Sequence, residues 1–137
     1  HANIHNAELA RRINLSPPAT HARLRRLERE GFIKAYTAVL DRDKLGYGLT
    51  VFVQVTLRAH QNEVEEALRA VVAQLPEVME CYHVTGETDF LMKVLVPNMK
   101  AYEEFVLNKL TKVNGIGNIN SSIVMSVVKQ KTDILFS

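Results

Sequence analysis

Arginine side chains are concentrated in one short segment of this chain, where four of them lie within residues 17–29, PPATHARLRRLER. The residue spacing predicts a helix there, with Thr20, Leu24 and Leu27 as its inward stripe. A helix in the major groove of DNA puts small residues against base edges near its N-terminus and places cationic groups on phosphates further along. The alternative is a basic face that contacts only water. The outward positions have the DNA-binding layout: Pro18, Ala19, Ala22, Arg25, Arg26 and Arg29.

A second short helix is expected just before this one, joined to it by a tight turn. Leu9 and Ile13 lie four residues apart, as on one face of a helix. Asn6 can cap this first helix and Ser16 the second, where Pro17 takes the first helical position and its missing N–H costs nothing. The whole pattern predicts a helix-turn-helix.

The charge of the chain is divided unevenly along its length. Residues 1–45 carry nine Lys and Arg against five Asp and Glu, a net charge of +4, whereas residues 46–137 carry eight against ten, a net charge of −2. A polyanionic partner therefore fits the N-terminal third and does not fit the remainder.

Length and composition indicate one or two small soluble domains, with 137 residues of which 47% are hydrophobic. The sequence has no run of about 18 apolar residues, so it predicts no membrane span. The first residues lack the pattern of a signal peptide. The single cysteine, Cys81, excludes an intramolecular disulfide and fits a reducing cytosol, as a small buried residue on a strand. We expect a cytoplasmic, nucleoid-associated protein with no membrane partner.

Residues 46–137 predict a βαββαβ order, in which two helices cover one face of a four-stranded antiparallel sheet. Gly31 is expected to end the arginine-rich helix, and an extended segment over 32–40 follows. The polar, glycine-bearing stretch 41–48 suggests a boundary between domains 1–45 and 46–137. The fold class is therefore α+β, a helix-turn-helix followed by a ferredoxin-like domain. Its expected elements are a strand over 49–57, a helix over 62–74 capped by Asn62, strands over 78–85 and 89–96, a helix over 99–110 capped by Asn98, and a strand over 119–128.

The sheet face that the two helices leave uncovered is expected to be apolar. Alternation places Tyr82 and Val84 with Phe90, Met92 and Val94 on one face. If one face of the sheet were open to water, polar and apolar residues should alternate more regularly along each strand. We therefore expect a second copy of the chain to cover the other face, which would carry Met79, Cys81, His83, Leu91 and Leu95.

Four segments of the chain resemble the Lrp/AsnC, or feast/famine, transcription regulators of bacteria and archaea: NLSPPATHARLRRLEREGFI, YTAVLDRDKLG, ECYHVTGETDFLMKV and VPNMKAYEEFV. The resemblance implies a winged helix-turn-helix, an amino-acid-sensing (RAM) domain, dimers that often assemble into octamers, and a small effector, usually an amino acid. The resemblance also implies a further helix at the start of family members, and we expect this chain to start after it. Asn14 replaces the usual glycine, and Glu87 replaces a frequent Asp, which leaves the effector preference open.

The resemblance also assigns candidate site residues. For Arg23, a phosphate contact and an internal salt bridge are both open. The DNA-binding candidates are Ser16, Pro18, Ala19, His21, Ala22, Arg23, Arg25, Arg26 and Arg29. The effector-binding candidates are His83, Thr85, Gly86, Asp89, Met99, Ser122, Ile123 and Val124.

The chemistry of the effector candidates suits an amino acid. Asp89 can hold its ammonium group, and the Gly86 turn, Thr85 and Ser122 can donate to its carboxylate. Met99 can adapt to its side chain. Alternatively, Gly86 and Asp89 only build a hairpin turn, and Ser122 is only a strand residue.

Two other function classes compete with a DNA-binding regulator. An enzyme is not expected, because the five histidines are scattered and no metal-ligand set, phosphate loop or nucleophile elbow is present. We therefore predict no catalytic residue, no metal and no cofactor. A stand-alone amino-acid-binding module that regulates an enzyme is the alternative, and the basic helix argues against it. The expected partners are double-stranded DNA, further copies of the chain and an amino-acid effector.

Overall fold

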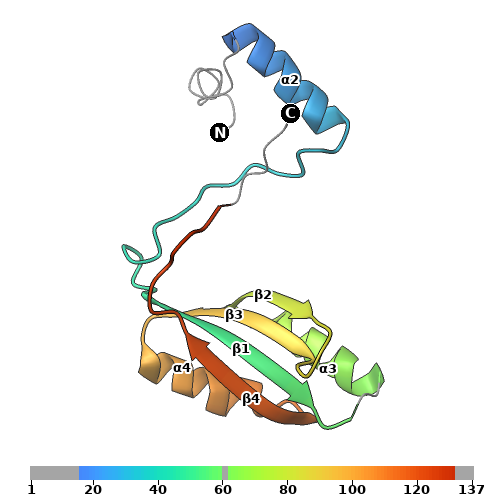
Figure 1. The fold of residues 1–137 in the computed structure, drawn as a ribbon, viewed down its shortest axis with the longest axis vertical. Coiled ribbons are helices and arrows are strands. Elements are labelled where there is room, and N and C mark those ends of the chain that lie inside the picture. Colours follow the sequence, from blue (N-terminus) through green and yellow to red (C-terminus); the bar gives the residue numbers. More distant parts are fainter. Residues whose placement is uncertain (1–15, 60–61, 132–137) are drawn as a thin grey trace. The chain divides into compact units, whose positions relative to one another are not determined.

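The computed structural model describes residues 16–59 and 62–131 (Figure 1). The chain forms two compact units, His1–Leu40 and Asp41–Ser137. The predicted first helix, with Asn6, Leu9 and Ile13, lies outside the described residues.

Helix α2 (Pro17–Arg29) begins where the sequence predicts. Ser16 is its N-cap, and the Ser16 side chain accepts a hydrogen bond from the N–H of Ala19 at 3.3 Å. Thr20 is completely buried and Leu24 and Leu27 are partly buried, so the predicted inward stripe is confirmed.

Gly31 ends α2 as predicted. Its φ of +81° is a left-handed conformation that glycine adopts without a steric penalty. The N–H of Phe32 donates to the carbonyl of Leu27 at 2.8 Å, and the N–H of Gly31 donates to the carbonyl of Glu28 at 3.2 Å. This pair of bonds is a Schellman motif, which satisfies carbonyls that the helix would otherwise leave unpaired.

The segment after α2 belongs to no sheet in the described part of the chain, and residues 33–40 have no assigned secondary structure. The hydroxyl of Tyr36 donates to the carboxylate of Glu28, which ties the segment to α2. This hydrogen bond to an anion, together with desolvation, raises the pKa of Tyr36. A wing strand therefore stays a prediction.

The described residues of the second unit, 41–59 and 62–131, form the predicted ferredoxin-like fold. Strands β1 (Leu49–Leu57), β2 (Val78–His83), β3 (Phe90–Val96) and β4 (Ile116–Ile123) make one sheet in the order β2-β3-β1-β4, and every neighbouring pair is antiparallel. Between β1 and β2 lies α3 (Asn62–Val72), and between β3 and β4 lie α4 (Met99–Phe105) and the π-helical η2 (Val106–Leu110) (Figure 1).

One face of the sheet packs against both helical segments and forms the core. Val51, Val53 and Val55 of β1 are fully buried, whereas Phe52 and Gln54 between them are exposed. The buried valines belong to one cluster with helix side chains and with β3: Leu68, Tyr102, Phe105, Leu110, Phe90, Met92 and Val94. The opposite sheet face, which neither helix covers, is called the open face below.

The helices differ from the prediction at their ends. Asn62 is the first residue of α3 rather than its cap, and α3 ends at Val72 rather than Gln74. Beyond it the N–H of Gln74 bonds the carbonyl of Val71, three residues back, which tightens and closes the last turn. Asn98 caps α4 as predicted and accepts from the N–H of Ala101 at 2.9 Å.

The predicted single helix over 99–110 changes to a π-helical turn at Val106. The N–H of Thr111 bonds the carbonyl of Val106, five residues earlier, at 2.9 Å. Phe105 and Leu110 are both buried, and the wider turn brings these residues, five apart, toward the same core.

The strand boundaries were predicted less well. β2 ends at His83 rather than Thr85, and β3 starts at Phe90 rather than Asp89. β4 spans Ile116–Ile123, so the predicted strand over 119–128 was placed too late. The N–H of Val124 still bonds the carbonyl of Thr50 at 3.0 Å. β1 begins at Leu49, which the register places opposite Met125, so residues 126–128 have no further length of β1 to pair with.

The predicted faces of β2 were wrong. Cys81 pairs with Met92 and His83 pairs with Phe90, and residues directly opposite each other lie on the same face. Cys81 and His83 are therefore on the helix-covered face, and Tyr82 is on the open face opposite Leu91. Alternation within each strand could not show this, because the hairpin register decides which residues lie opposite.

The open face is consequently mixed rather than apolar throughout. Charged and amide groups interrupt its apolar side chains. By strand register it carries Thr50, Phe52, Gln54, Glu80, Tyr82, Leu91, Lys93, Leu95, Asn118, Asn120 and Ser122.

Candidate DNA-binding face and effector region

The outward face of α2 is accessible along its whole length. Arg25, Arg26 and Arg29 are exposed, and the side chain of Arg26 has 70% of its surface accessible. The small residues at the start of the helix are exposed too: Ser16, Pro18, Ala19 and Ala22. The structure thus keeps the predicted order of side chains along α2. The small residues at its N-terminal end allow a partner to approach the backbone closely, and the cationic residues follow them.

Two acidic side chains, one on α2 and one just after its end, accept hydrogen bonds from nearby side chains. Glu30 accepts from Nε of Arg26 at 3.4 Å, and Glu28 accepts from Tyr36. The Arg26–Glu30 pair is exposed and therefore weak. Arg23 is exposed and pairs with no acid among the described residues, whereas His21 is partly buried. This favours the phosphate contact for Arg23, and both roles stay predictions.

Four effector candidates lie at the β2–β3 hairpin. Thr85 and Gly86 are exposed in the loop, where Gly86 has a φ of +109° that favours glycine. Asp89 is buried, with 9% of its surface accessible. Its Oδ2 accepts from the N–H of Leu57 at 2.7 Å, and its own N–H donates to the carbonyl of Val55 at 3.0 Å. Asp89 therefore joins the hairpin to the end of β1.

His83 belongs to a cluster with α3 that the sequence analysis missed. Its ring stacks on Phe90 with centroids 4.7 Å apart, and the guanidinium of Arg69 lies 5.7 Å from the Phe90 centroid. Nδ1 of His83 is 3.5 Å from an Arg69 nitrogen, and Nε2 is 3.8 Å from Oε1 of Glu65. The four-residue spacing of Glu65 and Arg69 was the available signal, because it places both on one face of α3.

Cys81 lies on the same helix-covered face as His83 and is partly buried, as expected for it. Burial raises the pKa of its thiol, although the nearby charge of Arg69 acts in the opposite direction. The thiol is therefore protonated at neutral pH and is not an activated nucleophile.

The other four effector candidates lie at the opposite end of the sheet. Ser122 pairs with Phe52 and Ile123 with Val51, and Val124 follows β4 directly. Met99 starts α4 just after β3, whose last residue, Val96, pairs with Leu49. Ser122 faces the open side and Ile123 the helix side, because neighbouring strand residues alternate.

One chain does not bring the two groups of effector candidates together. The hairpin group lies beside the Leu57 end of β1, and the β4 group lies beside its Leu49 end. Along β1, Phe52 opposite Ser122 and Leu57 bonded to Asp89 are five residues apart, which is about 16 Å at about 3.3 Å per residue. A site that uses both groups needs a second copy of the chain.

The described residues contain no group of three or more His, Cys, Asp or Glu side chains placed to hold a metal ion. Among the helices in the described part of the chain, none combines the length and apolar composition that crossing a membrane requires.

Two family descriptions match the chain, and they match consecutive parts of it. Residues 1–34 match "Winged helix-turn-helix DNA-binding", and residues 50–134 match "Lrp/AsnC ligand binding domain". The leucine-responsive regulatory protein of Salmonella typhimurium is 40% identical over 132 residues, which cover 96% of this chain and 80% of that protein. The protein of the same name from Escherichia coli strain K12 is 39% identical over 132 residues, with the same coverage.

Solved structures show the same fold. A transcriptional regulator of Neisseria meningitidis in complex with L-Met has a TM-score of 0.84 and 35% identity, covering 94% of this chain and 83% of that one. AsnC of Escherichia coli has a TM-score of 0.79 and 26% identity, covering 97% and 88%. With a DNA-binding helix-turn-helix followed by the matching ligand-binding domain, this chain belongs to the Lrp/AsnC family of transcriptional regulators.

Proposed function

We propose that this chain binds a specific double-stranded DNA sequence through α2, and that an amino acid bound by its RAM domain changes that binding. The exposed arginine face of α2 is the observation that carries the proposal. Ser16 caps the start of that helix and the Gly31 motif closes its end, so both ends are fixed without any partner. Such a preorganised helix can enter a groove without losing further backbone entropy.

An amino-acid effector is supported by the relatives and by the hairpin chemistry. One structural neighbour was solved with L-Met, and the curated relatives are named leucine-responsive. Exposed Thr85 and Gly86 offer a hydroxyl and a backbone N–H to a carboxylate, and Asp89 provides the neighbouring negative charge. Because the candidate groups lie at opposite ends of the sheet, we place the effector between two copies of the chain.

The remaining parts of the proposal follow from this arrangement. A regulator of this kind works as a dimer or a larger assembly, up to an octamer. Its target is chromosomal DNA, so it acts in the cytoplasm and associates with the nucleoid. It needs no catalytic residue and no cofactor other than the amino acid.

DNA selection followed by titration tests this function. A fragment enriched by the full chain from a random pool is labelled and compared, by fluorescence anisotropy, with a shuffled fragment of equal composition. We expect the enriched fragment to bind more tightly, and at least one amino acid from a panel that includes L-leucine and L-methionine to shift its affinity.

The possible results separate the competing functions. Equal affinity for enriched and shuffled DNA would refute sequence-specific recognition. Amino-acid binding in calorimetry without sequence-specific DNA binding would favour the alternative, a regulatory module of an enzyme. DNA binding that no amino acid alters would remove the effector part alone.

A further inference from the structure

The loop between β2 and β3, residues 84–89, has two ends that are held differently. At the β3 end, the N–H of Asp89 donates to the carbonyl of Val55, and the carboxylate of Asp89 accepts from the N–H of Leu57. Both partners belong to β1, which lies beside β3 inside the sheet. This end of the loop is therefore fixed to the centre of the fold.

The β2 end of the loop lies at the edge of the sheet. In the described sheet β2 is an edge strand and pairs only with β3. The N–H of Val84 donates to the carbonyl of Asp89 at 2.9 Å, which closes the loop on itself. Thr85 and Gly86, the proposed donors to the effector carboxylate, follow directly and are exposed. His83, the last residue of β2, is thus the point at which the fold can hold these donors.

Arg69 of α3 contacts both residues of the pair at the base of this loop, where the loop lies beside α3 (Figure 1). His83 and Phe90 lie opposite each other in the ladder, and their rings stack with centroids 4.7 Å apart. A guanidinium nitrogen of Arg69 lies 3.5 Å from Nδ1 of His83, and the guanidinium carbon lies 5.7 Å from the Phe90 centroid. A planar guanidinium can stack on a ring and donate a hydrogen bond at the same time. One side chain of α3 therefore holds both strands where the loop begins.

A second side chain of α3 lies on the other side of the imidazole. Oε1 of Glu65 is 3.8 Å from Nε2 of His83. In the neutral ring the nitrogen that accepts from Arg69 is Nδ1, so Nε2 carries the proton and faces the carboxylate. Glu65 and Arg69 are four residues apart, on one face of α3, and orient the ring through both of its nitrogens.

We propose that Arg69 is a positioning residue for the amino-acid response. Together with Glu65 it fixes His83, and through His83 the exposed donors that follow it, without touching the amino acid itself. This inference rests on the proposed effector function. The cluster lies on the helix-covered face of the sheet, so contact between two copies through the open face does not cover it.

The carboxylate end of the ligand should feel the loss of this contact most. Without Arg69, the donors at Thr85 and Gly86 lose the anchor below them, whereas Asp89 keeps its bonds to β1. The affinity for the carboxylate should therefore fall, and the affinity for the remainder of the ligand should change little.

Calorimetry on the full chain with matched ligands tests this role. L-leucine and L-methionine are each compared with their carboxamides, which keep the side chain and the ammonium group and lack the negative carboxylate. We expect Arg69→Met to weaken binding of the preferred amino acid by about three- to tenfold, as for a lost hydrogen bond, and to weaken binding of its carboxamide much less. A general loss of stability would not change the ratio of the two affinities.

Two further variants separate positioning from charge. Arg69→Lys keeps the positive charge but lacks the planar group that reaches His83 and Phe90 together, so it should weaken binding about as much as Arg69→Met. Lys112→Met is a matched control, because it removes an exposed cation from outside the cluster, and it should bind like the wild type. DNA binding without effector should be unchanged in all three variants.

Amide hydrogen exchange measures the loop without any ligand. The N–H of Val84 should exchange faster in Arg69→Met, because its hydrogen bond to Asp89 opens more often. The N–H of Val53, in the central strand β1, should keep its wild-type rate. Equal acceleration at both positions would mean a general destabilisation and would overturn the positioning role.

Other results also overturn the positioning role and leave the effector function standing. One is an Arg69→Met variant that binds both ligand forms like the wild type, with unchanged exchange at Val84. Another is wild-type affinity in Arg69→Lys, which would assign the effect to charge alone. If no amino acid of the panel binds the wild type, the proposed effector function fails instead, and the exchange rate of Val84 still decides whether Arg69 holds the loop.

Discussion

Oδ2 of Asp89 accepts a hydrogen bond from the backbone N–H of Leu57 at 2.7 Å, across 32 positions of sequence. Leu57 follows the point where the register between β1 and β4 shifts, so its N–H is near a break in the ladder. Leu57 is buried, with 4% of its surface accessible, and a buried N–H needs an acceptor. The carboxylate thus has a structural role whether or not it also binds an effector.

Removing this acceptor should destabilise the protein. Asp89→Ala leaves the Leu57 N–H without its partner, and we expect the free energy of unfolding to fall by about 1–3 kcal/mol. Asp89→Asn keeps a side-chain oxygen that can accept, so it should cost less. Urea denaturation of both variants measures the difference. Equal loss in both would mean that the charge of Asp89, and not its acceptor oxygen, stabilises the hairpin.

The effector role of Asp89 makes a separate prediction. Asp89→Asn keeps the shape of the side chain but removes the charge for an ammonium group, a loss of about 1.5–3 kcal/mol for a charged hydrogen bond. Calorimetry with L-leucine and L-methionine should show weaker binding by the variant, while DNA binding without effector persists. Equal affinity in both proteins would remove Asp89 from the effector site. A variant that fails to fold would support the purely structural role.

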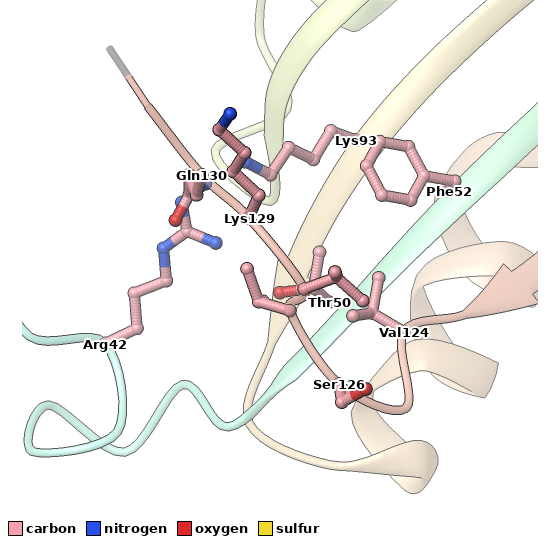
Figure 2. A pocket seen from close by; sticks show the side chains of 10 residues that line it. Arg42, Thr50, Phe52, Lys93, Val124, Ser126, Lys129 and Gln130 are labelled. Carbon is pink, nitrogen blue, oxygen red and sulfur yellow. The ribbon is translucent and has the colours of Figure 1, made fainter. Parts of the chain in front are cut away.

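Sequence patterns predicted the elements of the fold better than their contacts. Ser16, Gly31 and Asn98 were assigned correctly, because caps depend on a few neighbouring backbone groups. The face of His83 was not predictable, because the hairpin register decides it. A groove lined by Arg42, Lys93 and Lys129 was missed for a similar reason, because these residues are far apart in sequence and only the fold brings them together (Figure 2).

Arg25 and Arg26 should contribute to DNA binding through phosphates. Replacing both by Ala should weaken binding to the enriched fragment with little loss of stability, because both side chains are exposed on α2. The slope of log K against log salt should fall by about 1 for each lost phosphate contact. Lys100→Ala with Lys112→Ala is the matched control. Unchanged affinity and slope in the arginine variant would contradict the placement of this face against DNA.

The hydroxyl of Tyr82 lowers the pKa of Glu80, so Tyr82→Phe should raise that pKa toward its ordinary value. A carboxyl whose pKa is depressed on folding stabilises the protein above its unfolded pKa, and this stabilisation is lost as the pH falls through the folded value. The stability difference between wild type and Tyr82→Phe should therefore shrink on acidification. NMR titration of Glu80 measures the pKa, with Tyr47→Phe as control. An unshifted Glu80 would show that Tyr82 does not hold it in solution.

The open face should form the contact between two copies of the chain. Phe52 and Tyr82 have 39% and 53% of their surface accessible there, and Leu91 lies opposite both Gln54 and Tyr82 in the ladder. Leu91→Glu would place an unpaired charge in that contact, which is costly to bury. Leu107→Glu is a matched control, because Leu107 is exposed on η2 rather than on the sheet. Sedimentation velocity should show a dimer or larger assembly for wild type and Leu107→Glu, and dissociation for Leu91→Glu. A folded wild-type monomer at micromolar concentration, or an intact Leu91→Glu dimer, would rule out the open face as the contact.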